Sequence, residues 1–141
     1  MKSIITFLTA FFILECCQAQ NVTFIEIKIT NFMFRIVPNG RSSLAVSGDK
    51  LLPLGLYKAK GLEKEFRQVA ELIEKINFFE LAADEAAKKN WPLILYPPMS
   101  RITVEKQGKK IFLCYSYPND FKDFDDKIFE IVKKIIWEKI N

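Results

Sequence analysis

Carboxylates and thiols are the side chains best suited to chemistry in this 141-residue chain, because the chain contains no histidine. Histidine is the commonest general base and a frequent zinc ligand, so its absence excludes His-based triads and most zinc sites. Asp84 and Glu85 are adjacent acids that would form an acid–base pair if burial separated their pKa values. They lie among Ala and Lys residues, which favours a solvated segment. A carboxylate-based hydrolase therefore stands as one alternative hypothesis.

A second group of acids lies near the C-terminus, at Asp120, Asp123, Asp125 and Asp126. Asp123 and Asp126 are three residues apart and share a face if the segment is helical. Calcium loops space their ligands around a glycine and end in a bidentate glutamate, which this segment lacks. The acids are better explained as first-turn residues that favour a helix N-terminus, and we predict no metal ion, cofactor or catalytic site here.

The three cysteines divide into an N-terminal pair, Cys16 and Cys17, and a single residue, Cys114. A nucleophilic cysteine needs a histidine, a cation or a helix N-terminus to lower its pKa. Cys114 lies in a strand-like stretch without such a signal, so we interpret it as a sheet residue. Its position out of phase with Leu113 and Tyr115 puts it on the opposite sheet face.

Residues 1–19 predict a secretory signal peptide. A single cation, Lys2, precedes an apolar run of 11 residues from Ile4 to Leu14. That run is too short for a bilayer core, which needs about 20 residues. Cleavage after Ala19 leaves a domain of residues 20–141 with one thiol. In the alternative, Cys16 or Cys17 is lipidated and anchors the domain to the outer membrane.

Aromatic residues outside the regular patterns are the candidates for partner binding. The segment from Trp91 to Met99 is rich in rigid side chains suited to recognition, and it also fits as cover for a sheet edge. Trp137 falls opposite the apolar stripe of the last helix, where it is either exposed or docks the end of the chain. The candidate partner-binding residues are Trp91, Tyr96, Met99 and Trp137.

The basic excess is small and dispersed. The chain carries 21 Lys and Arg against 17 Asp and Glu, for a formal net charge of +4. Nucleic-acid-binding proteins concentrate charge beside stacking aromatics, and this chain does not. We therefore expect no nucleic-acid partner, a protein partner in the envelope, and membrane contact only through a lipid anchor.

Period-two alternation predicts the strands. Ile25, Ile27 and Ile29 alternate with polar residues, and a second strand spans residues 32–36 before the Asn39-Gly40 turn. A short third strand is predicted over residues 42–47, and residues 55–61 are predicted as a connector. The clearest hairpin turns at Gln107-Gly108, between residues 102–104 and 111–117.

Helical spacing predicts the remaining elements. Apolar residues recur every three or four positions from Leu62 to Ile76, and Asn77 is a plausible left-handed end. A short helix is predicted over residues 82–90. The last helix is predicted to start at an Asn119 or Asp120 cap and to carry its apolar flank as far as Ile140. Together these elements predict an α+β fold, a two-layer sandwich in which an antiparallel sheet of four to five strands carries two main helices on one face.

The chain resembles small exported and lipoprotein domains of unknown function from Gram-negative envelopes. The features that carry the resemblance are the strand from Phe32 into Asn39-Gly40, the helix exit at residues 76–81, the hairpin around Gly108 and the helix after Pro118. The resemblance implies an envelope location, periplasmic or secreted, and a two-layer fold, and it supplies no catalytic residue. We therefore expect a non-enzymatic binding domain, with an inhibitor or immunity-type protein against a secreted enzyme as a further alternative.

Overall fold

The computed structural model describes residues 21–29, 31–47, 52–87, 99–116 and 120–141, without the side chains of 84–87, 99 and 116. Within these ranges the chain forms seven strands and three helices, so the fold is α+β. The strands are β1 (Val22–Ile29), β2 (Phe32–Ile36), β3 (Arg41–Val46), β4 (Gly55–Lys60), β5 (Met99–Lys106), β6 (Lys109–Ser116) and β7 (Glu138–Lys139). The helices are α2 (Glu63–Lys75), α3 (Phe78–Ala87) and α4 (Lys122–Lys134).

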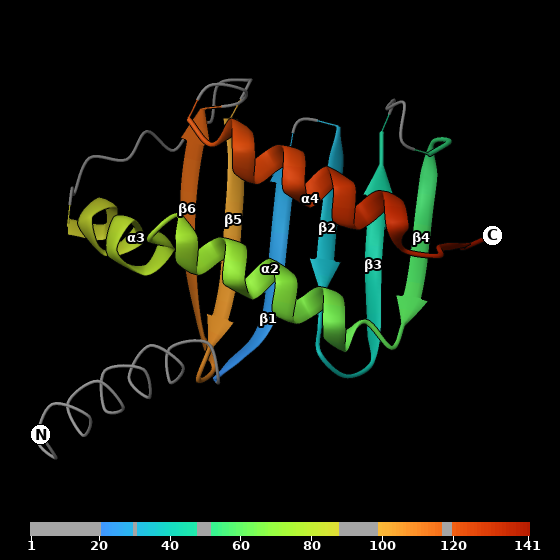
Figure 1. Ribbon diagram of the computed structural model, residues 1–141, viewed down its shortest axis with the longest axis horizontal. Helices are drawn as coiled ribbons and strands as arrows, with labels where there is room; N and C mark the ends of the chain where they lie inside the picture. Colours follow the sequence, from blue (N-terminus) through green and yellow to red (C-terminus); the bar gives the residue numbers. More distant parts are fainter. Residues whose placement is uncertain (1–20, 30, 48–51, 88–98, 117–119) are drawn as a thin grey trace, which may run out of the picture.

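All strands pair antiparallel in one sheet of order β6-β5-β1-β2-β3-β4-β7. Figure 1 shows the six longer strands side by side, with β1 inserted between β5 and β2. The β5–β6 hairpin turns through Gln107 and Gly108, both at positive φ, as the sequence predicts. The sheet has more strands than the four to five expected.

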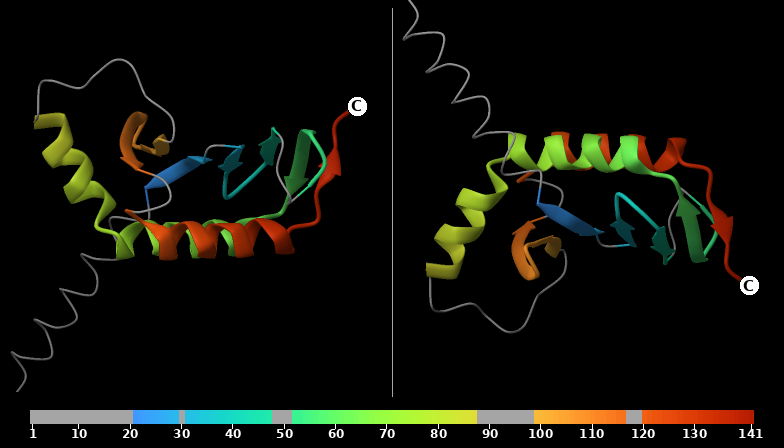
Figure 2. Two further views of the ribbon diagram at one scale, coloured as in Figure 1. Left: turned by 90° about the horizontal axis from the view of Figure 1, so that it is seen from above. Right: turned by 90° about the horizontal axis from the view of Figure 1, so that it is seen from below.

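Two helices cover one face of the sheet. Figure 2 shows α2 and α4 along the same face, with α3 standing beside the β6 edge. The core between the layers is built from alternate strand residues, among them Ile27, Phe34 and Ile102, each 0% exposed. Helix residues such as Val69 and Ile128, also 0% exposed, fill the other side. The alternate residues of the strands and the apolar residues of the helices, which recur every 3.6 positions, therefore pack into one core.

The segment predicted as a connector is strand β4, so that prediction is wrong. Tyr57 of β4 pairs with Leu44 of β3 and is buried, while Leu56 and Lys58 face the other side. The hydroxyl of Tyr57 donates a hydrogen bond to the Pro53 carbonyl, 2.6 Å away. Flanking glycines and two lysines hide the alternation of this strand, and pairing with β3 supplies the partner that the local sequence does not reveal.

The two helical predictions near the middle of the chain need one change. Helix α2 ends at Lys75 with Ile76 as its C-cap, and Asn77 follows at φ 55°, in the left-handed region expected for it. The next helix, α3, starts at Phe78 rather than at Ala82. Phe78 is 0% exposed and contacts Phe79 edge to face at 5.2 Å. Burial of this first aromatic residue holds the helix start against the core.

The last helix is shorter than expected at its C-terminal end. It stops at Lys134, because Ile135 is extended with ψ 136°, and the chain then forms β7 against β4. Its N-cap residue is Phe121, which makes no side-chain cap hydrogen bond. The predictions of an Asp120 cap and of a helix reaching Ile140 are therefore wrong, and Asn119, the alternative cap, lies outside the described residues. The Ile140 N–H instead donates to the Leu56 carbonyl at 2.8 Å, which joins the end of the chain to the β4 edge of the sheet.

Candidate binding surface

The side of the sheet turned away from α2 and α4, here called the open face, is built by the alternate residues that the core does not use. Register places Thr103, Glu26, Arg35, Ser43 and Lys58 in one continuous row across five strands. A neighbouring row in register is made of Cys114, Arg101, Lys28, Met33, Ala45 and Leu56. Side chains in such rows are neighbours on one face, because paired residues point to the same side of a sheet.

A buried carboxylate organises the middle of the open face. Glu26 of β1 is 6% exposed, and its Oε2 accepts a hydrogen bond from Arg35 Nε at 2.5 Å. Arg101 Nη2 of β5 lies 3.5 Å from the other carboxylate oxygen. Both arginines are partly exposed, with 50% and 39% of their side-chain surface accessible. Glu26 therefore holds two guanidinium groups in place while leaving part of each accessible to a ligand.

Two pairs of like charges lie directly opposite each other on this face. Lys28 of β1 pairs in register with Arg101 of β5, and Arg41 of β3 pairs with Lys60 of β4. Like charges in direct cross-strand pairs destabilise a sheet. Glu26 offsets this repulsion beside Arg101, but the described residues place no ion-pair partner on Arg41 or Lys60. The arrangement is therefore suited to a ligand that carries negative charge.

The acids of the described strands and helices lie mostly on the helical side, which leaves the open face with an excess of cations. The open face carries seven cations and three acids, Glu26, Glu105 and Glu138. The other side of the molecule carries ten cations and eleven acids. Seven of these cations and all eleven acids are on the three helices, and the other three cations are the strand residues Lys106, Lys109 and Lys139. The cations of the open face are Lys28, Arg35, Arg41, Lys58, Lys60, Arg101 and Lys110. The open face is therefore basic, whereas the helical side is nearly neutral.

Apolar groups are interspersed among these charges. Phe112 on β6 is 55% exposed and Leu56 on β4 is 58% exposed. Lys110 Nζ lies 5.8 Å from the centroid of the Phe24 ring, within the range of a cation–π contact. The open face therefore offers both charge and apolar contact area, the combination found at protein-binding surfaces.

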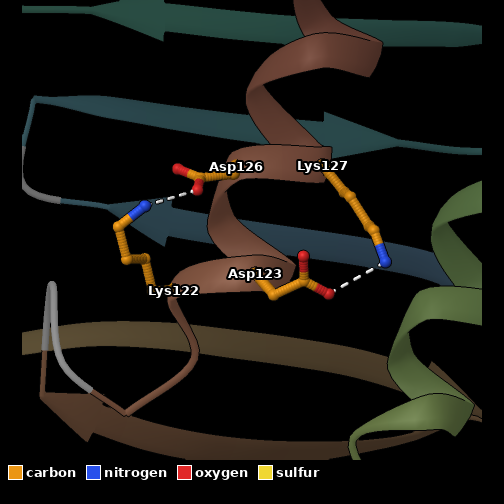
Figure 3. Close-up of polar contacts among 4 residues, drawn as sticks. All are labelled: Lys122, Asp123, Asp126 and Lys127. Carbon is orange, nitrogen blue, oxygen red and sulfur yellow. Dashed lines mark hydrogen bonds and ion pairs between the residues drawn. The ribbon is translucent and has the colours of Figure 1, made fainter.

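The helical surface, by contrast, neutralises its charges internally. Lys122 Nζ donates to Asp126 at 2.7 Å and Lys127 Nζ donates to Asp123 at 2.8 Å, both pairs one turn apart on α4 (Figure 3). The hydrogen bond and charge of Lys127 lower the pKa of the Asp123 carboxyl below its usual value. Asp123 and Asp126 are thus exposed partners in ion pairs with lysines of the same helix. No group of three or more metal-ligating side chains occurs among the described residues.

A third acid of that group, Asp125, is buried between α4 and the sheet, which the sequence reasoning missed. It is 2% exposed, and the Tyr115 hydroxyl donates to its Oδ1 at 2.5 Å. Burial raises the pKa of Asp125 to about 6, and the nearby Asp126 adds to the rise while the Tyr115 hydrogen bond opposes it. Asp125 Oδ2 and the buried hydroxyl of Ser100, which pairs in register with Tyr115, have no hydrogen-bond partner among the described residues. The spacing Phe124-Asp125-Ile128 on the apolar stripe was the available signal.

Two hollows lie on the helical side, away from this buried acid. One of about 700 Å³ is lined by the end of α2 and the start of α3, including Glu71, Asn77 and Phe79. The other, of about 460 Å³, runs between α2 and α4 over Leu72 and Ile131. Asp125 does not line either hollow, so a ligand bound in one of them would not contact its carboxyl group.

The candidate residues from the sequence are placed as follows. Trp137 is half-buried against the core, with its ring 6.0 Å from Phe34 and its Nε1 donating to the Val132 carbonyl at 3.0 Å, so it docks the end of the chain. Met99 begins β5, on the strand next to the β6 edge. Trp91 and Tyr96, like Cys16 and Cys17, lie outside the described residues.

The remaining candidates are Cys114 on β6 and the acids Asp84 and Glu85 on α3. Cys114 is buried on the side of β6 opposite Leu113 and Tyr115, as its alternation predicts. Asp84 and Glu85 belong to α3, and their side chains are outside the description. Across the described part of the chain, no helix has the length and apolar character needed to cross a membrane. Comparison with known proteins returns no matching family model, no matching curated protein and no matching solved structure.

Proposed function

We propose that this protein is an exported, non-enzymatic binding domain that holds an acidic protein partner on the open face of its sheet. The observation that carries the proposal is the separation of charge, with seven cations against three acids on the open face. Oppositely charged patches steer encounter and fix the orientation of a complex. The like-charge pairs Lys28–Arg101 and Arg41–Lys60 lose their repulsion when an acidic surface lies against them.

The geometry of Arg35 and Arg101 supports a protein ligand. Arginine forks bind carboxylates through two parallel hydrogen bonds, and Glu26 already fixes one side of each fork. Arg and aromatic residues are enriched at protein interfaces, and Phe112 and Phe24 flank this cluster on the same face. The export component rests on residues 1–19, whose apolar run and small residues near Ala19 fit a signal peptide.

The proposal is tested by exchanging charge on one side of the molecule at a time. Lys28→Glu with Lys60→Glu changes the open face at two exposed positions outside the Glu26 cluster. Lys64→Glu with Lys75→Glu makes the same change in net charge on the exposed side of α2. Each tagged full-length variant is produced in the native host and used to capture proteins from the envelope fraction. Captured proteins are identified by mass spectrometry, purified and titrated against each variant.

We expect an acidic protein that binds the wild type and the α2 variant, and whose affinity for the open-face variant falls at least tenfold. Its affinity for the wild type should decline as salt is raised, because the contact is between charges. Equal binding by both variants, or a partner whose affinity is independent of salt, would contradict the proposal. If the partner is a secreted enzyme that loses activity in the complex, the binding domain is of the inhibitor or immunity type.

A further inference from the structure

Exposed aliphatic residues collect at one edge of the sheet, away from the centre of the open face. Five large apolar side chains are exposed among the described residues, and four of them lie at the edge formed by β4 and β7. The fifth, Phe112, lies on β6 at the opposite edge. The four are Leu54 at 68%, Leu56 at 58%, Ile136 at 93% and Ile140 at 42%. Such clustering marks an interaction site, whereas single exposed residues do not.

Pairing between β4 and β7 brings these residues together. The Ile140 N–H donates to the Leu56 carbonyl, and Lys58 pairs with Glu138. Antiparallel register then sets Leu54, Leu56 and Ile140 at one end of the edge. Ile136 lies at the other end, where the chain leaves α4. Figure 1 shows this edge at the end of the molecule opposite α3, where the C-terminus emerges. The four side chains are here called the aliphatic edge.

Lysines surround the aliphatic edge. Lys58 and Lys60 extend from β4, Lys139 from β7, and two more lysines end α4 at positions 133 and 134. Two of the five lysines are ion-paired, Lys58 with Glu138 at 3.4 Å and Lys133 with Glu130 at 3.6 Å, so the rim keeps an excess of positive charge. The edge thus combines protruding aliphatic side chains with a cationic rim.

We infer that the aliphatic edge docks on an anionic lipid surface, with Leu54 and Ile136 entering the headgroup region and the lysines contacting lipid phosphates. This composition contains no arginine, tryptophan or tyrosine, the residues enriched where protein partners bind most tightly, in contrast to the centre of the open face with Arg35 and Arg101. It is the composition of a membrane-surface contact, in which apolar insertion and attraction of Lys to anionic lipids act together. A second copy of the chain is disfavoured, because it would oppose one lysine rim to another. The inference does not depend on the proposed function.

The test measures binding of the protein, isolated from its own cells, to vesicles of phosphatidylcholine with and without phosphatidylglycerol. Leu54→Asn with Ile136→Asn removes the two most exposed members of the edge without touching the core. Phe112→Asn is the matched control, because it removes one exposed apolar residue at the opposite edge. Lys134→Glu with Lys139→Glu tests the cationic rim at exposed positions that are not part of the open face. Sedimentation with the vesicles gives the bound fraction for each variant.

We expect the wild type and Phe112→Asn to bind phosphatidylglycerol vesicles equally, and the two edge variants to bind roughly tenfold more weakly. To separate this contact from any N-terminal anchor, an environment-sensitive dye is attached at Ile136→Cys and, in a second sample, at Phe112→Cys. A blue shift on anionic vesicles at position 136, without one at 112, supports the inference. Equal binding by all variants, absence of the shift at 136, or self-association that depends on the aliphatic edge would overturn it.

Discussion

Each face of the sheet carries a buried carboxylate, but the groups that contact the two carboxylates differ. Asp125, under α4, is 2% exposed and accepts one neutral hydrogen bond from Tyr115. Glu26, on the open face, is 6% exposed and accepts contacts from two arginines. Burial without a counter-charge raises the pKa of Asp125 to about 6, whereas Glu26 has two cationic side chains beside its oxygens. The helix-covered face is therefore built to exclude charge and the open face to display it.

We therefore expect mutations on the covered face to affect mainly stability, and mutations on the open face to affect mainly binding. On the covered side, apolar volume and proton uptake dominate, because water is excluded. On the open side, charges remain partly solvated, so each contributes little to folding but much to recognition. Four experiments with single-residue variants test this difference between the two faces.

The largest effect is expected for neighbouring residues of β2 that point to opposite faces. Phe34 is 0% exposed beneath the helices, whereas Met33 is only partly buried on the open face. Phe34→Ala should lower the free energy of unfolding by about 3–5 kcal/mol, since it leaves a cavity and removes the contact with Trp137. Met33→Ala should cost about 1 kcal/mol or less. Urea titrations of both variants give the comparison, and equal losses would show that the open face is packed like the core.

The second effect is a pH dependence that originates at Asp125. Its pKa is about 6 in the folded protein against 3.8 for the ordinary carboxyl. The folded state therefore holds a proton that the unfolded chain releases. Stability from this group is fully present below about pH 4 and is lost as the pH rises through 6. The loss is roughly 2–3 kcal/mol.

Measurement of the free energy of unfolding from pH 4 to pH 7.5 tests this dependence. Asp125→Asn keeps an oxygen acceptor for Tyr115 but cannot ionise, so it should flatten the profile over this window. The lowered pKa of Asp123 acts with the opposite sign and below this range, since its contribution is lost as the pH falls below about 3.8. If Asp125→Asn follows the wild-type profile, the carboxyl does not hold its proton in the folded state.

An intermediate effect is expected at the carboxylate on the open face. Glu26→Gln removes the negative charge between Arg35 and Arg101, which are both able to turn toward solvent. The expected loss in unfolding free energy is about 1–2 kcal/mol, less than for a fully buried pair. Glu138→Gln is the control, because its pair with Lys58 is exposed and should be worth about 0.5 kcal/mol or less. Thermal unfolding of both variants at two salt concentrations compares the two losses in stability. Equal losses would show that Glu26 contributes no more to stability than an exposed ion pair.

The smallest effect is a difference in sign between two lysines. Lys28 faces Arg101 in a like-charge pair on the open face, whereas Lys127 donates to Asp123 on α4. Lys28→Gln should raise the unfolding free energy by a few tenths of a kcal/mol at low salt, and Lys127→Gln should lower it by about 0.3–0.5 kcal/mol. Both differences should shrink at high salt. Chemical denaturation of the two variants and the wild type in parallel decides this, and a loss for Lys28→Gln would contradict the cross-strand repulsion.

Local signals predicted those elements whose periodicity is complete within a short stretch. Helix α2 follows its apolar spacing and is terminated by the left-handed Asn77 just beyond its C-cap. The β5–β6 hairpin turns at Gln107-Gly108, where both residues have positive φ. Strand β4 was missed because its register is fixed by β3, not by its own sequence. Strand β7 was missed because the stripe of α4 continues into Ile135 and Ile136, although the chain is already extended at Ile135. Pairing with Leu56 offsets the loss of another helical turn.

Composition and short-range periodicity were enough to predict the class of fold, the two amphipathic helices and the absence of histidine chemistry. Only the tertiary structure decided which cations share a face. Register places Arg41 opposite Lys60 and sets Glu26 between two arginines that are 9 and 75 positions away along the chain. It also buried Asp125 while its neighbours Asp123 and Asp126 stayed in solvent. Charge and burial depend on neighbours in space, and strand order, not chain order, supplies those neighbours.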